Sequence, residues 1–127
     1  LIREAGLESR CSVIEGNMFE RVHPGGDLYV LKTVIHDWDD DSSIRILRNC
    51  REAMTSESRL LLMEMVVPEG NDPHPSKFMD LNMLVLTHGG RERTAAEYRA
   101  LFEASGFELS RIIATPSPMS LLEGIPR

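Results

Sequence analysis

The sequence predicts a doubly wound α/β sheet formed by a single domain over residues 1–127. Nearly continuous apolar runs of strand length alternate with segments whose apolar residues recur at helical spacing. This alternation is typical of sheets that are covered by helices. In addition, 127 residues with 42% hydrophobic content are enough for one hydrophobic core and too few for two.

Three segments in the first half are predicted to be strands. Ser9–Glu15 is a short one, and Asp27–Val34 is a second, whose unbroken apolar content favours burial on both faces of a parallel sheet, with Lys32 buried within it. Arg59–Pro68 is a third apolar run, interrupted only by Glu64. Because an unpaired carboxylate inside a buried strand is costly, we expect Glu64 to have a partner.

Helices are predicted between and after these strands. Asp41–Met54 carries apolar residues at helical spacing behind a cluster of capping acids and serines. Glu69–Phe78 is a loop rich in Pro, Asn and Asp, and Met79–Leu86 follows it as a helix. The sequence Thr94-Ala95-Ala96-Glu97 is a capping box, so a helix begins there and ends at Gly106.

The C-terminal segment is predicted to close the sheet as an antiparallel hairpin. Its two strands are Leu109–Ala114 and Met119–Glu123, and the turn between them contains two prolines. Both strands are short, and the connection is brief enough for them to pair with each other.

Charge and composition exclude several function classes. The formal net charge is −6 and the 14 basic residues are interleaved with acids, so no basic surface for nucleic acid or an anionic membrane is expected. No apolar run approaches the ~20 residues of a membrane span, and no charged-then-apolar signal opens the chain, which favours a cytoplasmic location. Cys11 and Cys50 have no metal-site spacing and are expected to be buried free thiols.

Polar residues follow two of the predicted strands. In sheets of this type, ligands bind beyond the carboxyl ends of the parallel strands. This rule places His36, which ends the second predicted strand, on the same rim as Asn17-Met18, which follow the first. It also makes His36 the nearest plausible partner for Glu64.

Three motifs stand in order along the chain: GNMF at 16–19, LKTVIHDWDDDSSIRILRNC at 31–50 and GGRERTAAEYRALFEASGF at 89–107. Together they resemble the S-adenosylmethionine-dependent small-molecule O-methyltransferases, the family of the plant caffeate and flavonoid enzymes and of bacterial enzymes that act on polyketides. The resemblance implies a Rossmann-like class I methyltransferase sheet, S-adenosylmethionine as cofactor, a small-molecule hydroxyl acceptor and a homodimer of the full-length protein.

The resemblance also implies the catalytic residues. The family's general base is the histidine of its HDW motif, which falls on His36, and the two acids that flank it fall on Glu64 and Glu92. Deprotonating a phenol of pKa ~10 with an imidazole of pKa ~6.5 is uphill by roughly 5 kcal/mol. A carboxylate pair would narrow that gap by stabilising the imidazolium, and the mechanism requires no metal.

Cofactor and acceptor contacts are implied in the same way. The family's adenine-contacting GDMF falls on Asn17, Met18 and Phe19, with Asn17 in place of the usual aspartate, and its cofactor-contacting strand lysine falls on Lys32. The residues implied to border the acceptor pocket are Asp37, Met83 and Thr87.

The family's glycine-rich cofactor loop has no counterpart in these 127 residues. The sequence PGGD at 24–27 precedes a strand, and HGGR at 88–91 precedes a capped helix, so neither glycine pair lies between a strand and a helix. The resemblance therefore implies that the chain is the C-terminal part of the catalytic domain, without the first strands, the glycine loop and the N-terminal dimerisation domain. Such a segment is expected to be inactive alone and to bind S-adenosylmethionine weakly.

Two other interpretations stay open. His36-Asp37 with Asp40 resembles the cluster of a metal-dependent phosphohydrolase, although such clusters lie on helices of all-α folds. Alternatively, the chain is a non-catalytic module that uses a methyltransferase-like sheet for protein assembly. The run Asp39, Asp40 and Asp41 favours a solvated helix start over a metal site.

Overall fold

The computed structural model describes residues 1–127 and contains one mixed sheet with the strand order β1-β2-β5-β4. These strands are β1 (Leu28–Lys32), β2 (Arg59–Val67), β5 (Met119–Pro126) and β4 (Phe107–Ala114). β1 and β2 are parallel, whereas β5 is antiparallel to both β2 and β4. A two-residue strand, β3 (Arg93–Thr94), pairs in parallel with the C-terminal end of β2.

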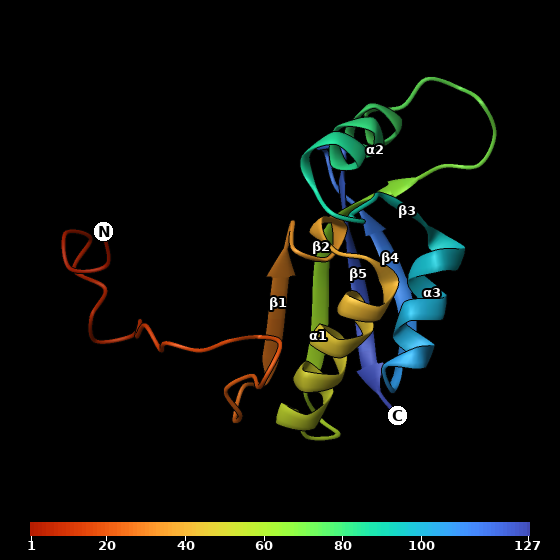
Figure 1. The fold of residues 1–127 in the computed structure, drawn as a ribbon. Coiled ribbons are helices and arrows are strands. Elements are labelled where there is room, and N and C mark those ends of the chain that lie inside the picture. The colour runs from red at the N-terminus through yellow and green to blue at the C-terminus, as the bar shows by residue number, and fades with distance from the viewer.

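Helices cover one face of this sheet and one of its ends. α1 (Asp40–Ala53) and α3 (Ala95–Ala104) lie side by side on the same face, whereas α2 (Pro75–Leu86) lies beyond the carboxyl end of β2 (Figure 1). A short 3₁₀ turn, η1 (Ile35–Asp37), connects β1 to α1. None of the helices is both long and apolar enough to cross a membrane.

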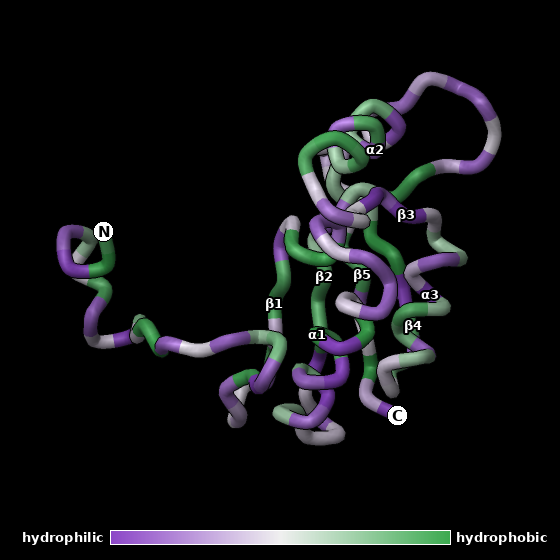
Figure 2. Tube along the Cα trace, viewed as in Figure 1, coloured by the Kyte–Doolittle hydropathy of each residue, from purple (hydrophilic) through white to green (hydrophobic).

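The hydrophobic core lies between the sheet and the two helices on its covered face. Apolar residues run along β1 and β2 (Figure 2), and in β2 every second residue as far as Glu64 is fully buried. Leu60, Leu62 and Glu64 occupy these buried positions, because alternate residues of a strand point to the same face. A carboxylate therefore continues a row of leucines at the end of the core.

The segment Ser9–Glu15, predicted to be a strand, has no regular structure. It runs away from the sheet (Figure 1), and its apolar residues Val13 and Ile14 are exposed. A strand exists only through pairing, and no strand lies beside this segment, so its apolar pattern alone does not produce one.

β1 is the edge strand of the sheet. The prediction that it is buried on both faces is wrong, because only one of its faces is covered. Tyr29 and Leu31 are partly covered, whereas Leu28 and Val30 are 53% and 49% exposed on the other face. Lys32 is likewise exposed at the end of the strand rather than buried within it. The covering helices lie on one side only, and Lys32 shares the uncovered face with Leu28 and Val30.

Several local predictions are confirmed. The side chains of Thr94 and Glu97 form the capping box of α3, and Gly106 has the left-handed φ of +83° that ends it. β4 and β5 form the predicted antiparallel hairpin. α2, however, begins at Pro75, inside the predicted loop, because a proline fits the first turn of a helix and the side chain of His74 caps it.

Gly124 of β5 lies where the sheet meets α3. A Cβ at this position would overlap the ring of Phe102 and press on Leu60. Gly124→Ala should therefore lower the free energy of unfolding by about 1–3 kcal/mol, measured by urea denaturation. Gly16→Ala is the matched control, since a Cβ there meets no atom within 4 Å, and equal losses in both variants would contradict this packing.

Candidate active site

The turn that carries His36 is fixed to the sheet by Glu64. After β1, Thr33 adopts a left-handed φ of +50°, which is unusual for a β-branched residue. The backbone N–H groups of Val34 and Ile35 then both donate to Glu64 Oε1, at 3.0 and 2.9 Å. The buried carboxylate thus has partners, as the sequence requires, and these partners begin the η1 turn.

The imidazole of His36 stands between two buried carboxylates. Its Nδ1 lies 2.9 Å from Glu92 Oε1 and 3.9 Å from Glu64 Oε2. The side chains of Glu64 and Glu92 are 0% and 1% exposed, and that of His36 is 13% exposed. Because a carboxylate only accepts hydrogen bonds, Nδ1 carries a hydrogen and donates it to Glu92. Nε2 is then the nitrogen that can take a proton from a ligand.

The surroundings of this group shift two pKa values upward. The hydrogen bond to Glu92 raises the pKa of His36, burial opposes it, and the charge of Glu64 adds to the rise. Burial raises the pKa of Glu64 to about 7, although the charge of His36 and the two backbone N–H groups act against it. The carboxylates of Glu64 and Glu92 are buried together, and a proton on His36 compensates their negative charge.

Glu64 should make stability depend on pH. The pKa of Glu64 is about 7 in the folded protein, above its ordinary value of 4.5. The stability contributed by the protonated side chain is therefore fully present below about pH 4.5 and is lost as pH rises through 7. Glu64→Gln removes this ionisation, so relative to the wild type the variant should gain about 2–3 kcal/mol between pH 5 and pH 8. Urea unfolding at both pH values measures this gain. If the difference in unfolding free energy between the variant and the wild type were the same at pH 5 and pH 8, the ionisation of a buried Glu64 would be contradicted.

Three buried polar atoms have no hydrogen-bond partner within the protein: Glu64 Oε2 and Glu92 Oε2, on the two acids beside the imidazole, and the Tyr98 hydroxyl. Tyr98 is fully buried on α3, and burial together with the charges of Glu64 and Glu92 raises its pKa well above the ordinary value. The acids beside His36 are thus the groups that favour an imidazolium, Glu92 through its hydrogen bond and Glu64 through its charge.

The residues implied to border the acceptor lie around the same turn. Asp37 Oδ1 is 3.5 Å from His36 Nε2, and its side chain is about half exposed. The hydroxyl of Thr87 ends α2 by donating to the carbonyl of Met83 at 2.8 Å, and it accepts from the N–H of Gly90. A Cβ on Gly90 would overlap both this hydroxyl and the His36 carbonyl, which shows that Thr87 lies close to His36. Met83, one turn earlier in α2, is buried.

The segment Asn17–Phe19 reaches the same turn from the other side. Asn17 Oδ1 accepts from the N–H of Phe19 at 3.0 Å, and the carbonyl of Met18 accepts from Asn49 of α1 at 2.7 Å. The ring of Phe19 packs edge-on against Trp38, with centroids 4.7 Å apart. This contact joins the GNMF motif to the HDW motif, although the two are distant in sequence.

A mostly apolar hollow of about 270 Å³ lies beside Met18. Its lining includes Val22, Leu31 and Ile46. Such a surface fits a flat, weakly polar ring such as adenine. Lys32 is exposed at the end of the strand that borders the hollow, where its charge remains hydrated.

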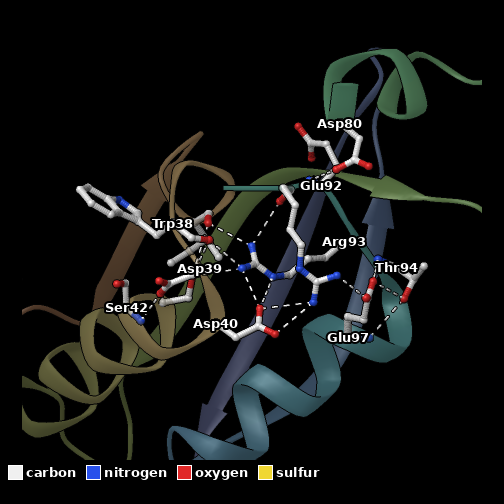
Figure 3. A network of polar contacts seen from close by, with 12 residues as sticks. Trp38, Asp39, Asp40, Ser42, Asp80, Glu92, Arg93, Thr94 and Glu97 are labelled. Carbon is white, nitrogen blue, oxygen red and sulfur yellow. Dashed lines mark hydrogen bonds and ion pairs between the residues drawn. The ribbon is translucent and has the colours of Figure 1, made fainter. Parts of the chain in front are cut away.

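The metal cluster that His36-Asp37 and Asp40 suggested does not form. Asp40 is paired with the guanidinium groups of Arg93 and Arg91, at 2.8 and 3.0 Å. Figure 3 shows its carboxylate directed at Arg93. His36, Glu64 and Glu92 do bring one ligand atom each within 4.8 Å of one another. A cation there would compete with the proton on Nδ1 of His36.

Sequence reasoning missed two residues that shape this site. Arg93 is fully buried beneath the η1 turn, and Asp80 of α2 accepts from the backbone N–H of Glu92 at 2.8 Å (Figure 3). An arginine within GGRERT suggests a solvated surface by composition alone. The sequence around Arg93 holds no signal of its burial, because the carbonyls that it contacts belong to residues distant along the chain.

Comparison with known proteins identifies the family of the chain. Residues 2–108 match the family model of the O-methyltransferase domain. The phenazine O-methyltransferase PhzM of Lysobacter antibioticus is 49% identical over 125 residues, which cover 98% of this chain and 36% of that protein. The O-demethylpuromycin-O-methyltransferase of Streptomyces alboniger is 44% identical over 127 residues, which cover 96% of this chain and 34% of that protein.

A solved structure shows the same arrangement of elements. NcsB1, an O-methyltransferase from neocarzinostatin biosynthesis in complex with S-adenosylmethionine and 2-hydroxy-5-methyl naphthoic acid, superposes with a TM-score of 0.88 at 35% identity. The match covers 99% of this chain and 36% of NcsB1. The fold is therefore that of the class I methyltransferases. The chain belongs to the O-methyltransferase family, and it spans about a third of the length of the curated relatives it matches.

Proposed function

We propose that the full-length protein containing this segment transfers a methyl group from S-adenosylmethionine to a hydroxyl, most simply a phenolic one, of a small-molecule acceptor, with His36 as general base. The observation that carries the proposal is the hydrogen bond of His36 Nδ1 to buried Glu92, with Glu64 behind it. This arrangement leaves Nε2 as the basic nitrogen at the mouth of the site. A module used only for assembly has no need of two buried acids on one imidazole.

The chemistry requires one proton acceptor beside the hydroxyl. S-adenosylmethionine, when bound, supplies an electrophilic methyl group on a positively charged sulfur. The acceptor oxygen forms a bond to the methyl carbon as the sulfur–carbon bond breaks, and the hydroxyl proton passes to His36 Nε2. Glu92 and Glu64 stabilise the imidazolium that results, and this narrows the gap of roughly 5 kcal/mol between a phenol and an unperturbed imidazole.

The remaining residues divide between the two ligands in this proposal. Asn17, Met18 and Phe19 form the wall for adenine, with Lys32 at the edge of the cofactor site. The residues that border the acceptor are Asp37, Met83 and Thr87. The segment is the C-terminal part of the catalytic domain, inactive by itself, and the full-length protein is a cytoplasmic homodimer.

The test is methyl transfer by the full-length protein with labelled S-adenosylmethionine and a panel of small phenols, aliphatic alcohols and aromatic amines. We expect labelled ether from phenols, with one S-adenosylhomocysteine formed per methyl group. Addition of a chelator should leave the rate unchanged. Activity that appears only with an added divalent metal, or binding of S-adenosylmethionine without transfer to any acceptor, would contradict the proposal.

A further inference from the structure

Arg93 is a fully buried cation beneath the turn that carries His36. Its Nη1 donates to the carbonyl of Ile35 at 3.0 Å, and its Nη2 donates to the carbonyl of Trp38 at 2.8 Å. These two carbonyls belong to the residues on either side of His36-Asp37. Figure 3 shows the guanidinium of Arg93 directed toward Trp38. One guanidinium therefore fixes both ends of the turn.

Asp40 anchors this guanidinium at the start of α1. Its Oδ1 accepts from Arg93 Nε at 3.0 Å and from Nη2 at 2.8 Å. Burying a cation is costly unless its charge is compensated and its donors are used, and here both conditions are met. Arg91 reaches the other oxygen of Asp40 from the solvent side and contacts neither carbonyl.

Neighbouring residues of the same segment hold other parts of His36. Glu92 accepts from the imidazole Nδ1, and Gly90 packs so closely on the His36 carbonyl that no Cβ would fit. The segment Gly90–Arg93 thus contacts the main chain and the ring of His36 at once. The hydroxyl of Ser43 reaches the same two carbonyls, but at the longer distances of 3.4 and 3.5 Å. Arg93 therefore makes the closer side-chain contacts to both ends of the turn.

We propose that Arg93 is a positioning residue for His36, setting where Nε2 stands relative to the acceptor hydroxyl. This inference rests on the proposed function of His36 as the base. A lysine would keep the charge, but a single ammonium cannot reproduce the planar fork that reaches two carbonyls and a carboxylate together. Misplacement of a catalytic group by about 1 Å costs on the order of 10²-fold in rate.

The test is a double-mutant cycle in the full-length protein with saturating S-adenosylmethionine and phenolic acceptor. Arg93→Lys should lower kcat by about 10- to 100-fold and leave the KM for S-adenosylmethionine within about twofold. In the His36→Gln background, the same change should cost less than about threefold, because no base is left to misplace. A merely structural arginine would cost the same in both backgrounds, and that result would overturn the inference.

Matched variants make the outcome specific. Arg91→Lys shares the partner Asp40 but touches neither carbonyl, so it should leave kcat unchanged. If Arg93→Lys does not fold, as judged by circular dichroism, Asp40→Asn replaces it, since this half-exposed anchor holds two of the guanidinium nitrogens. Asp40→Asn should lower kcat less than Arg93→Lys does, and this loss of kcat should also vanish in the His36→Gln background. A loss of kcat that persists there overturns the inference. If His36→Gln itself loses no activity, the proposed function fails instead.

Discussion

His36→Gln in the full-length protein is expected to lower methyl transfer at neutral pH by a factor on the order of 10² to 10⁴. Glutamine keeps a polar side chain of similar reach but cannot take the proton from the acceptor. The only remaining nucleophile is acceptor that has already ionised in solution. His23→Gln is the matched control, because His23 is exposed and the hydrogen bond of its ring is to the carbonyl of the adjacent Pro24.

The loss should shrink as pH rises. The fraction of ionised acceptor grows about tenfold per pH unit until the pH passes the acceptor's own pKa, and the rate of the variant should follow it. Initial rates between pH 6 and pH 10 would measure this recovery. A flat profile for the variant would show that His36 acts in some other way, with its position after β1 serving structure alone.

The second large effect concerns the two acids behind the imidazole. Glu64→Gln and Glu92→Gln should each lower kcat by about 10- to 100-fold while cofactor affinity stays nearly constant, because both act on one ring. Glutamine can still accept from the N–H groups of Val34 and Ile35, so the η1 turn should persist in the first variant. What each variant loses is the negative charge beside the imidazolium.

The double variant should be little worse than the more damaging single one. Groups that stabilise the same imidazolium are coupled, and their losses are not additive. A double-mutant cycle on kcat, with Glu123→Gln in the hairpin as control, would measure this coupling. Strictly additive losses would mean that at least one of the acids has another role.

Local signals predicted much of this fold. The capping box at Thr94, the glycine at 106 and the closing hairpin depend on neighbouring residues, and the structure has all three. Glu64 was also predictable in part, because a carboxylate within an apolar strand needs partners. The sequence did not show that its nearest partners are two backbone N–H groups rather than His36.

The errors concern features that depend on distant residues. Ser9–Glu15 has an apolar pattern that suits a strand, but pairing decides whether one forms. The apolar run of β1 resembles a strand covered on both faces, yet only one face is covered, so Lys32 is exposed. Arg93 carries no local mark of burial, since its carbonyl partners lie 58 and 55 positions away along the chain.

The dependence of kcat on the acidity of the acceptor tests the role of His36 most directly. A series of phenols of graded pKa would be compared in the wild type and in His36→Gln at one neutral pH. If His36 removes the proton during transfer, wild-type rates should vary only weakly with phenol pKa. The variant's rates should fall about tenfold for each unit by which the phenol becomes less acidic. Parallel dependences in the two proteins would contradict general-base catalysis by His36.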